Sequence, residues 1–248
     1  MFSIFSKSKY ISDYIPTEYT DIHSHILFGI DDGAKTYEDS ELIIKTLHEI
    51  GTQNIITTPH TSTHIWNNTP QIIQDKRTDL YNIIPDLATK MNITVASEYL
   101  LDDTFMQLIE TKNVLTYKDK HILVEFSYFN VPLNYQQLFF EIQLHGYQPI
   151  LAHPERYSYF NNHPEIFEEI KKSGVKLQLN LLSLVGYYGP DVMKMANELL
   201  KRNLYDFTGS DIHHKMHCKA IKNPIRLKYH NGLKDIMNNN KILLIQKE

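Results

Sequence analysis

Short, nearly continuous hydrophobic runs alternate along the chain with segments whose apolar residues recur at helical spacing. Seven such runs end near residues 22, 58, 96, 124, 152, 179 and 210. Runs that lack polar alternation are typical of strands that helices cover on both faces of a parallel sheet. The pattern therefore predicts an α/β fold of about seven parallel strands, arranged as an irregular barrel.

Amphipathic spacing and capping residues predict helices between these runs. The first spans 36–51 and begins with a capping-box pattern at Thr36. The second spans 69–90, and we expect Pro85 to break or kink it. Near the end of the chain, 238–240 is predicted to be a loop before one last element at 241–245. Four more helices are predicted at 103–110, 134–145, 163–172 and 190–202.

Composition limits the class of protein. A chain of 248 residues can bury a large core, and barrels of this length are commonly one domain. The formal net charge of -4 argues against nucleic acid or an anionic membrane bound through bulk charge. One cysteine, Cys218, excludes internal disulfides and fits a reducing compartment. Because no stretch is long and apolar enough to span a bilayer, we expect a cytoplasmic protein without membrane insertion.

Each hydrophobic run is followed by side chains that can bind a metal ion. The carboxyl ends of parallel strands open on one face of a barrel, so these side chains should meet in one site. Mixed imidazole and carboxylate donors suit Mn²⁺, iron or Zn²⁺. The sequence thus predicts a metal centre. The residues at the strand ends are His23, His25, His60, Glu98, Glu125, His153, Asn180, Asp211 and His213.

Taken singly, several of these residues have ordinary structural explanations. His23 and His25 point to the same side of a strand, but such pairs are common in proteins without a metal. The segment 31–33, Asp-Asp-Gly, could be a simple turn. Glu98 and Glu125 lie in apolar runs, where a salt bridge to a neighbouring strand is the alternative to a cation. As a set with the strand-end histidines, they favour a metal site.

The motifs resemble the polymerase and histidinol phosphatase (PHP) superfamily. Within it they are most similar to the manganese-dependent tyrosine phosphatases of the CpsB/CapC/YwqE type, encoded with bacterial capsule and exopolysaccharide genes. His153-Pro154-Glu155-Arg156 together with Gly-Ile-Asp-Asp-Gly at 29–33 is specific for this branch. Thr61 departs from the pattern, because a second histidine often stands there. The matching segments, in family order, are 21–25, 29–33, 58–60, 97–98, 125–126, 153–156 and 210–213.

The resemblance implies the single-domain PHP fold, a TIM-like (β/α)7 barrel, over 19–248, with an N-terminal extension at 1–18. It also implies three divalent metal ions, with Mn²⁺ preferred and Fe, Zn²⁺ or Mg²⁺ as alternatives. Glu98 would bridge the first two ions, whereas Asp32 and His213 would bind the third. The implied metal ligands are His23, His25, Asp32, His60, Glu98, Glu125, His153, Asp211 and His213.

The implied catalytic residues are Arg156, Asp211 and His213. A metal-activated hydroxide would attack phosphorus while the guanidinium of Arg156 holds phosphate oxygens. The alternative for Arg156 is an ion pair with Glu155 or with an acidic residue of a helix. Asp206 and His214 are candidates for a general acid, although a leaving phenolate needs little protonation because the pKa of tyrosine is about 10.

The implied function is that of a protein tyrosine phosphatase, a metal-dependent phosphoric monoester hydrolase. Its expected partner is a phosphotyrosine-bearing protein, such as the tail of a bacterial tyrosine kinase that regulates capsule or exopolysaccharide synthesis, and oligomerisation is compatible with the resemblance. The alternatives are a small-molecule phosphatase, such as one for histidinol phosphate, and a non-catalytic module stabilised by metal. Cys218 and Arg226 do not form a thiol-phosphatase loop, because too many residues separate them and none is a glycine.

Overall fold

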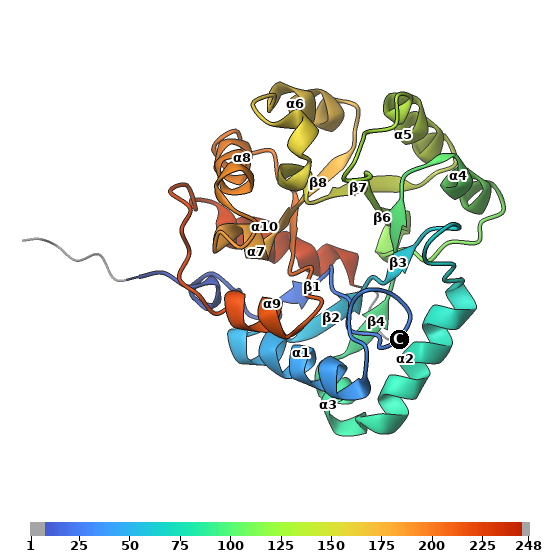
Figure 1. Cartoon of the computed structure of the whole chain (residues 1–248), viewed down its shortest axis with the longest axis vertical. Helices are drawn as coiled ribbons and strands as arrows, with labels where there is room; N and C mark the ends of the chain where they lie inside the picture. Colours follow the sequence, from blue (N-terminus) through green and yellow to red (C-terminus); the bar gives the residue numbers. More distant parts are fainter. Residues whose placement is uncertain (1–7, 245–248) are drawn as a thin grey trace, which may run out of the picture.

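The structure, a computed structural model, describes residues 8–244. Within this range the pairings between named strands are all parallel. They form a three-stranded sheet of order β1-β2-β4 and a six-stranded sheet of order β3-β5-β6-β7-β8-β9 (Figure 1). The strands are β1 (Thr20–Asp21), β2 (Asn54–Thr57), β3 (His60–Thr61), β4 (Ile93–Val95), β5 (Glu98–Leu100), β6 (His121–Glu125), β7 (Gln148–Ala152), β8 (Lys176–Asn180) and β9 (Phe207–Gly209).

These strands occupy seven positions around a barrel, because two of the predicted runs are each interrupted once. Pro59 separates β2 from β3, since proline cannot donate a hydrogen bond to the ladder. Pairing continues across the break: the N–H of Ala96 donates to the carbonyl of Thr57 (2.9 Å), and that of Glu98 to the carbonyl of Pro59 (3.2 Å). The two sheets therefore act as one curled layer.

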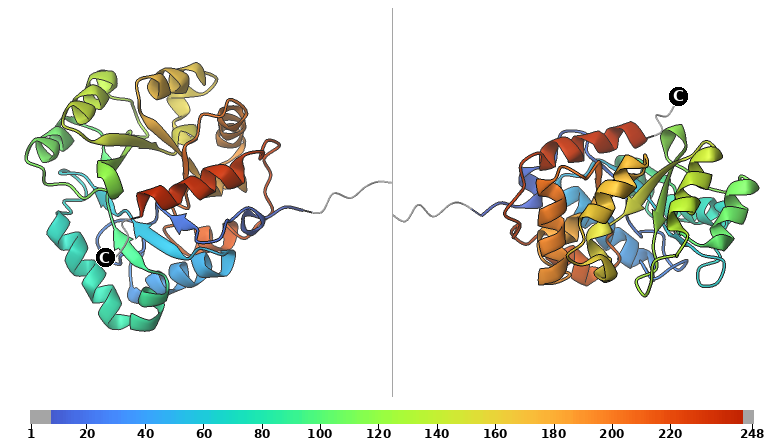
Figure 2. Two further views of the ribbon diagram at one scale, coloured as in Figure 1. Left: turned by 180° about the vertical axis from the view of Figure 1, so that it is seen from behind. Right: turned by 90° about the horizontal axis from the view of Figure 1, so that it is seen from above.

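The chain segments after β1 and β9 close this layer. The N–H of Asp211 donates to the carbonyl of His23 (2.7 Å), and the N–H of His25 donates to that of Ile212 (3.1 Å). Ser24 and Ile212 form an isolated parallel bridge between the same two segments. The prediction of an irregular, seven-stranded α/β barrel in one domain is confirmed (Figure 2).

Helices surround the strands, and the six predicted helical segments are all present. Thr36 caps α1, where the N–H of Asp39 donates to its hydroxyl, and Gly51 ends the helix at φ 111°. Pro85 divides the second segment into two helices, as predicted. The helices are α1 (Tyr37–Ile50), α2 (Pro70–Ile83), α3 (Pro85–Lys90), α4 (Asp103–Glu110), α5 (Tyr135–Leu144), α6 (Glu165–Lys172), α7 (Leu181–Leu184), α8 (Pro190–Lys201), α9 (Lys215–Ala220) and α10 (Leu233–Asn239).

Short 3-10 helices occupy several connections, at η1 (Ile11–Asp13), η2 (Lys118–Lys120), η3 (Pro154–Arg156), η4 (Ser158–Phe160) and η5 (Asn240–Leu243). The loop predicted at 238–240 is wrong, because α10 continues to Asn239 and passes directly into η5. The element predicted at 241–245 is the rest of η5, and residue 245 lies outside the described residues. Among the helices of the described range, none has both the length and the apolar character needed to cross a bilayer.

Two apolar clusters fill the two faces of the curled sheet. The smaller one contains Ile22, Ile56 and Leu123, whose neighbours along the strands, such as Ile55 and Val124, belong to the larger cluster with the helices. Because successive strand residues face opposite sides, the smaller cluster lies on the inner face of the barrel. The predicted boundary at residue 19 stays a prediction, and residues 1–7 of the extension lie outside the described range. Ile11 of that extension is fully buried.

The buried side chain of Asn240 joins β9 to β1. Its Oδ1 accepts from the N–H of Thr208 (3.0 Å), and its Nδ2 donates to the carbonyls of Thr208 (2.7 Å) and Thr20 (2.8 Å). These bonds satisfy three backbone groups at the seam where the barrel closes. Asn240 therefore stabilises the positions of both strands that lead to the site.

Asn240→Ala is expected to lower the free energy of unfolding by about 2–4 kcal/mol, because three buried backbone groups lose a side-chain hydrogen-bond partner. Urea denaturation measures the change. Asn238→Ala is the matched control: Asn238 is exposed on α10, so its loss should stay within about 0.5 kcal/mol. Equal losses in both variants would assign the effect to the helix and not to the seam.

Candidate metal centre

The structure brings the nine predicted metal ligands together at the carboxyl ends of the strands. Eight of them form three groups, in each of which the donor atoms lie within 4.8 Å of one another. The ninth, His153, places its Nε2 3.0 Å from Oε1 of Glu98 and 3.9 Å from Oε2 of Glu125. The three groups are His23, His25, Glu98 and Asp211; His60, Glu98 and Glu125; and His25, Asp32, His60 and His213.

His23 and His25 follow β1, and each directs one ring nitrogen into the cluster. Nδ1 of His23 is 2.9 Å from Oε1 of Gln178, and Nδ1 of His25 is 2.8 Å from Oδ2 of Asp31. These outer partners fix the orientation of each ring and leave Nε2 facing the other donors. The two Nε2 atoms lie 3.3 Å apart. This is the usual arrangement of histidines that bind a metal.

Asp31 and Gln178 are the positioning residues that sequence reasoning missed. Oδ2 of Asp31 also accepts from the N–H of His60 (3.1 Å), and its Oδ1 accepts from the N–H of Gly33 (2.9 Å). From the sequence alone, Asp31 is expected only as part of a possible turn. A signal for Gln178 was present, because it is a polar residue between two leucines in a buried strand.

The backbone is strained at two of the converging residues. His153 and Asp211 have φ values of 32° and 50°, in the left-handed region that residues with a Cβ rarely occupy. Gly209 is needed for the same convergence, because a Cβ at this position would lie 2.4 Å from Cβ of His23. The segments after β7 and β9 therefore adopt costly conformations that turn these side chains toward the centre.

Glu98 lies at the centre of the cluster and is completely buried. Its Oε2 lies 3.1 Å from Nε2 of His23 and 3.2 Å from Nδ1 of His60, yet no geometrically acceptable hydrogen bond reaches it within the described residues. A buried carboxylate oxygen in this position is costly unless a cation faces it. The orphaned oxygen and the mixed donor set both fit divalent cations.

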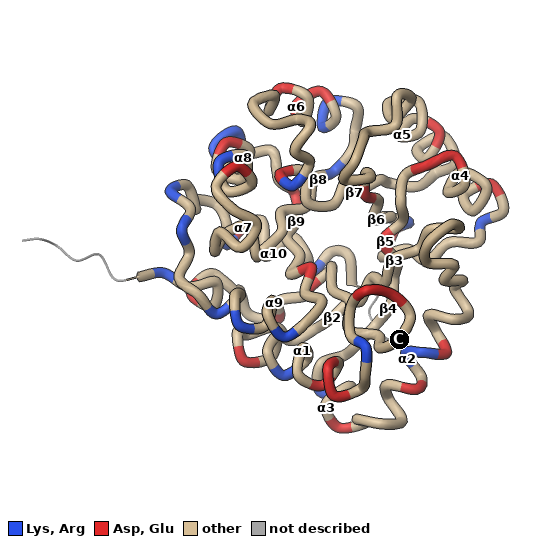
Figure 3. The backbone as a smooth tube through the Cα atoms, viewed as in Figure 1, with Lys and Arg blue, Asp and Glu red and all other residues tan. Residues whose placement is uncertain are grey.

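The imidazoles and carboxylates of the cluster shift one another's pKa values. Burial opposes charge on His60, but Glu125 and Glu98 raise its pKa to about 9. Burial would raise the pKa of Asp211, but His23, His213 and Arg156 lower it well below its ordinary value. Figure 3 shows acidic positions on the segments around β5 and β6, near the centre of the view. The carboxylates thus favour positive charge beside them, as expected where cations bind.

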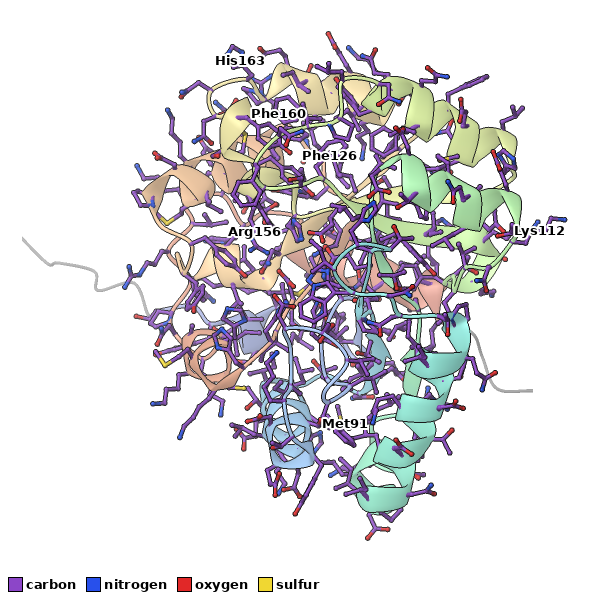
Figure 4. All side chains as sticks on the ribbon, turned by 45° about the vertical axis from the view of Figure 1, so that its right-hand side comes forward. Met91, Lys112, Phe126, Arg156, Phe160 and His163 are labelled. Atoms are coloured by element: carbon purple, nitrogen blue, oxygen red, sulfur yellow. The ribbon has the colours of Figure 1, made fainter. Side chains whose placement is uncertain are left out.

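Arg156, from η3, reaches this centre. Its Nη1 lies 2.5 Å from Oδ2 of Asp211. Figure 4 shows Arg156 beside the group of side-chain nitrogen and oxygen atoms at the middle of the molecule. The alternative ion pair with Glu155 is wrong, because Glu155 points elsewhere: its Oε1 accepts from Ser183 Oγ (2.8 Å) and its Oε2 from the hydroxyl of Tyr205 (2.9 Å).

The two candidates for a general acid differ in position. Asp206 is ion-paired with Lys171 (2.8 Å) and accepts from the N–H of Leu177, near the amino end of β8. It therefore lies at the opposite end of the strand from the centre, and the structure argues against its role. His214 stays beside the centre, next to His213, where its side chain caps α9.

Cys218 is buried, and burial raises the pKa of its thiol. A protonated, covered thiol is a poor nucleophile. The structure thus agrees with the exclusion of a thiol-phosphatase loop.

Comparison with known proteins gives the family. Residues 19–240 match the model of the family described as "Capsular polysaccharide synthesis, CpsB/CapC". The chain belongs to the CpsB/CapC family. The predicted resemblance is confirmed.

Several members of the CpsB/CapC family are similar to this chain over most of its length. It is 29% identical to "Putative tyrosine-protein phosphatase CapC" of Staphylococcus aureus, over 90% of each chain. It is 30% identical to "Tyrosine-protein phosphatase YwqE" of Bacillus subtilis (strain 168), over 78% of this chain and 76% of the relative. A solved structure matches this chain with a TM-score of 0.80 and 28% identity, and the match covers 91% of this chain and 94% of the chain in that structure. It is described as one of YwqE from Bacillus subtilis and CpsB from Streptococcus pneumoniae, "unique metal-dependent tyrosine phosphatases".

Proposed function

We propose that this CpsB/CapC-family chain is a metal-dependent protein tyrosine phosphatase, a phosphoric monoester hydrolase. The convergence of nine nitrogen and oxygen donors around the buried Glu98, with Arg156 on the same face, carries the proposal. The relatives named tyrosine-protein phosphatases support it, because they share the family and, in the solved structure, the fold.

In this proposal three divalent ions, with Mn²⁺ preferred over Fe, Zn²⁺ or Mg²⁺, occupy the centre. Glu98 belongs to two of the three donor groups and would bridge two ions. His153 would complete the second group, and Asp32 with His213 would hold the third ion. Because the divalent charges would exceed those of the four carboxylates, the loaded centre would attract a phosphate dianion. Hard and borderline donors together suit Mn²⁺ without excluding the alternatives.

The side chains of this chain would then bind and orient the phosphoryl group. When bound, the ions supply Lewis-acid activation of water and of the phosphoryl oxygens. Arg156 keeps donors that Asp211 does not use, and these can hold two non-bridging oxygens at once. Asp31 and Gln178 keep the two histidines after β1 in one tautomer. A leaving phenolate, with a pKa of about 10, departs with little help from an acid.

We also propose that the substrate is a phosphotyrosine-bearing protein, such as the tail of a bacterial tyrosine kinase that regulates capsule or exopolysaccharide synthesis. The family description, capsular polysaccharide synthesis, supports this choice. A cytoplasmic location fits such a kinase tail and the single thiol of Cys218.

Hydrolysis by metal-stripped protein, with and without added Mn²⁺, tests the function. A phosphotyrosine peptide and histidinol phosphate are offered separately, and we expect Mn²⁺ to restore turnover of the peptide only. Cys218→Ser should retain this activity, because the thiol is outside the centre. Turnover of histidinol phosphate alone would favour the small-molecule phosphatase. Bound metal with no hydrolysis of either ester would favour a non-catalytic module.

A further inference from the structure

Two tyrosine rings and one carboxylate surround the guanidinium of Arg156. Its Cζ lies 4.1 Å from the ring centre of Tyr188 and 4.8 Å from that of Tyr128, both within the range of a cation–π contact. Asp211 accepts from Nη1 at 2.5 Å. The guanidinium therefore lies over the rings of both tyrosines, and it is hydrogen-bonded to Asp211 along one of its edges.

The side chain of Asn180, at the end of β8, connects two of these three groups. Its Nδ2 donates to Oδ2 of Asp211 (2.8 Å) and to the hydroxyl of Tyr188 (3.2 Å). Its Oδ1 accepts from the N–H of Leu182 (2.8 Å), which fixes the amide orientation. Asn180 is fully buried, so these bonds are shielded from water. Tyr188 is thus attached to a rigid strand end.

The two rings differ in how firmly they are held. Tyr128 is 42% exposed, and among the described residues its hydroxyl contacts Nε2 of His153, at 3.4 Å. Tyr188 is half-buried and is bonded to the fully buried Asn180. Of the two, Tyr188 is the fixed surface against which Arg156 rests, whereas Tyr128 lies on the solvent side.

We propose that Tyr188 is a positioning residue that holds Arg156 ready to bind the phosphoryl group. The inference rests on the proposed role of Arg156 in phosphate binding. An arginine side chain has many rotamers, and fixing one of them before the ligand arrives removes that entropic cost from binding. The ring of Tyr188, anchored by Asn180, supplies this restraint without using any of the guanidinium's N–H donors. Asp211 alone would fix one nitrogen and leave the plane free to turn.

The test compares Tyr188→Leu with Tyr188→Phe in the Mn²⁺-loaded protein. Calorimetry measures the Kd of inorganic phosphate, and kinetics measures kcat/KM for a phosphotyrosine peptide. We expect Tyr188→Leu to weaken phosphate binding and lower kcat/KM by about 5- to 30-fold, the range of a partly desolvated cation–π contact. Tyr188→Phe keeps the ring and should lose no more than about 3-fold. Tyr229→Leu, which removes an exposed tyrosine ring beside Lys201, is the matched control.

A double-mutant cycle separates positioning from a general structural effect. If Tyr188 acts through Arg156, Tyr188→Leu should have no further effect on phosphate binding in an Arg156→Ala background. Equal losses in both backgrounds, or a fall in metal content by elemental analysis, would overturn the proposal. A protein that binds phosphate in an Arg156-dependent way but cleaves no phosphotyrosine would contradict the proposed function and leave the inference intact. Phosphate binding that is independent of Arg156 would overturn the inference itself.

Discussion

Glu98→Gln is expected to remove metal from at least two of the three donor groups and to lower kcat by more than about 100-fold. Changing only the outer partners of metal ligands already costs about 10- to 100-fold, so loss of a shared ligand should cost more. The substitution keeps the volume of the side chain in a fully buried position. It replaces one carboxylate oxygen by an amide N–H₂, which donates hydrogen bonds and cannot bind a cation.

The position of Glu98 explains why the effect should be so large. Its two oxygens approach different histidines: Oε1 lies 3.0 Å from Nε2 of His153, whereas Oε2 lies 3.1 Å from Nε2 of His23. It is the carboxylate that joins the group around His23 to the group around His60. Removing its charge therefore affects both groups at once.

Glu125→Gln is the graded comparison for this prediction. Glu125 belongs to one donor group only, so this variant should lose fewer ions per chain than Glu98→Gln. Elemental analysis after gel filtration counts the metal, and circular dichroism checks that both variants are folded. Full metal content in Glu98→Gln would contradict the placement of this residue at the centre. Equal metal loss in the two variants would contradict its bridging role.

Much of the fold could be predicted because its signals are local. Thr36 and Gly51 mark the ends of α1 through their own side chain and backbone. Pro85 breaks the second helical segment whatever its tertiary surroundings, because proline has no backbone N–H to donate within a helix. The loop predicted at 238–240 failed for the opposite reason. Three successive asparagines favour a turn locally, but burial of Asn240 against β1 and β9 determines the conformation.

The candidate site shows the same division. The ligands could be predicted because parallel strands bring their carboxyl ends together whatever the details of packing. Asp31 and Asp32 are neighbours in sequence and face different partners, so their separate roles depend on the backbone turn that the structure shows. The contact between Tyr188 and Arg156 joins segments after two different strands, and the local sequence carries no sign of it. Contacts between side chains on different loops are therefore the part of the site that the sequence does not predict.

Arg156→Ala is expected to lower kcat by about 100- to 1,000-fold, the usual cost of removing one donor that stabilises charge in a transition state. Its metal content should stay unchanged. Asp211 would lose its partner at Nη1, but Nδ2 of Asn180 still donates to the same oxygen at 2.8 Å. The bound cations would compensate the remaining negative charge. Activity and metal binding should thus separate in this variant, in contrast to Glu98→Gln.

Arg156→Lys should recover little of this loss, although it restores the positive charge. A lysine ammonium cannot hold two phosphoryl oxygens in one plane, nor can it keep one nitrogen on Asp211 while another binds the substrate. Kinetics with a phosphotyrosine peptide, together with elemental analysis, provides both readouts, and Arg202→Ala is the matched control on the outer surface of the barrel. Among the described residues, Arg202 pairs with Glu168 and Glu198, so its removal should leave kcat within about 2-fold, as is usual for surface ion pairs. Near-complete recovery of kcat by lysine would mean that Arg156 acts through its charge alone. Metal loss in Arg156→Ala would mean that Arg156 stabilises the bound metal and does not act through phosphate binding.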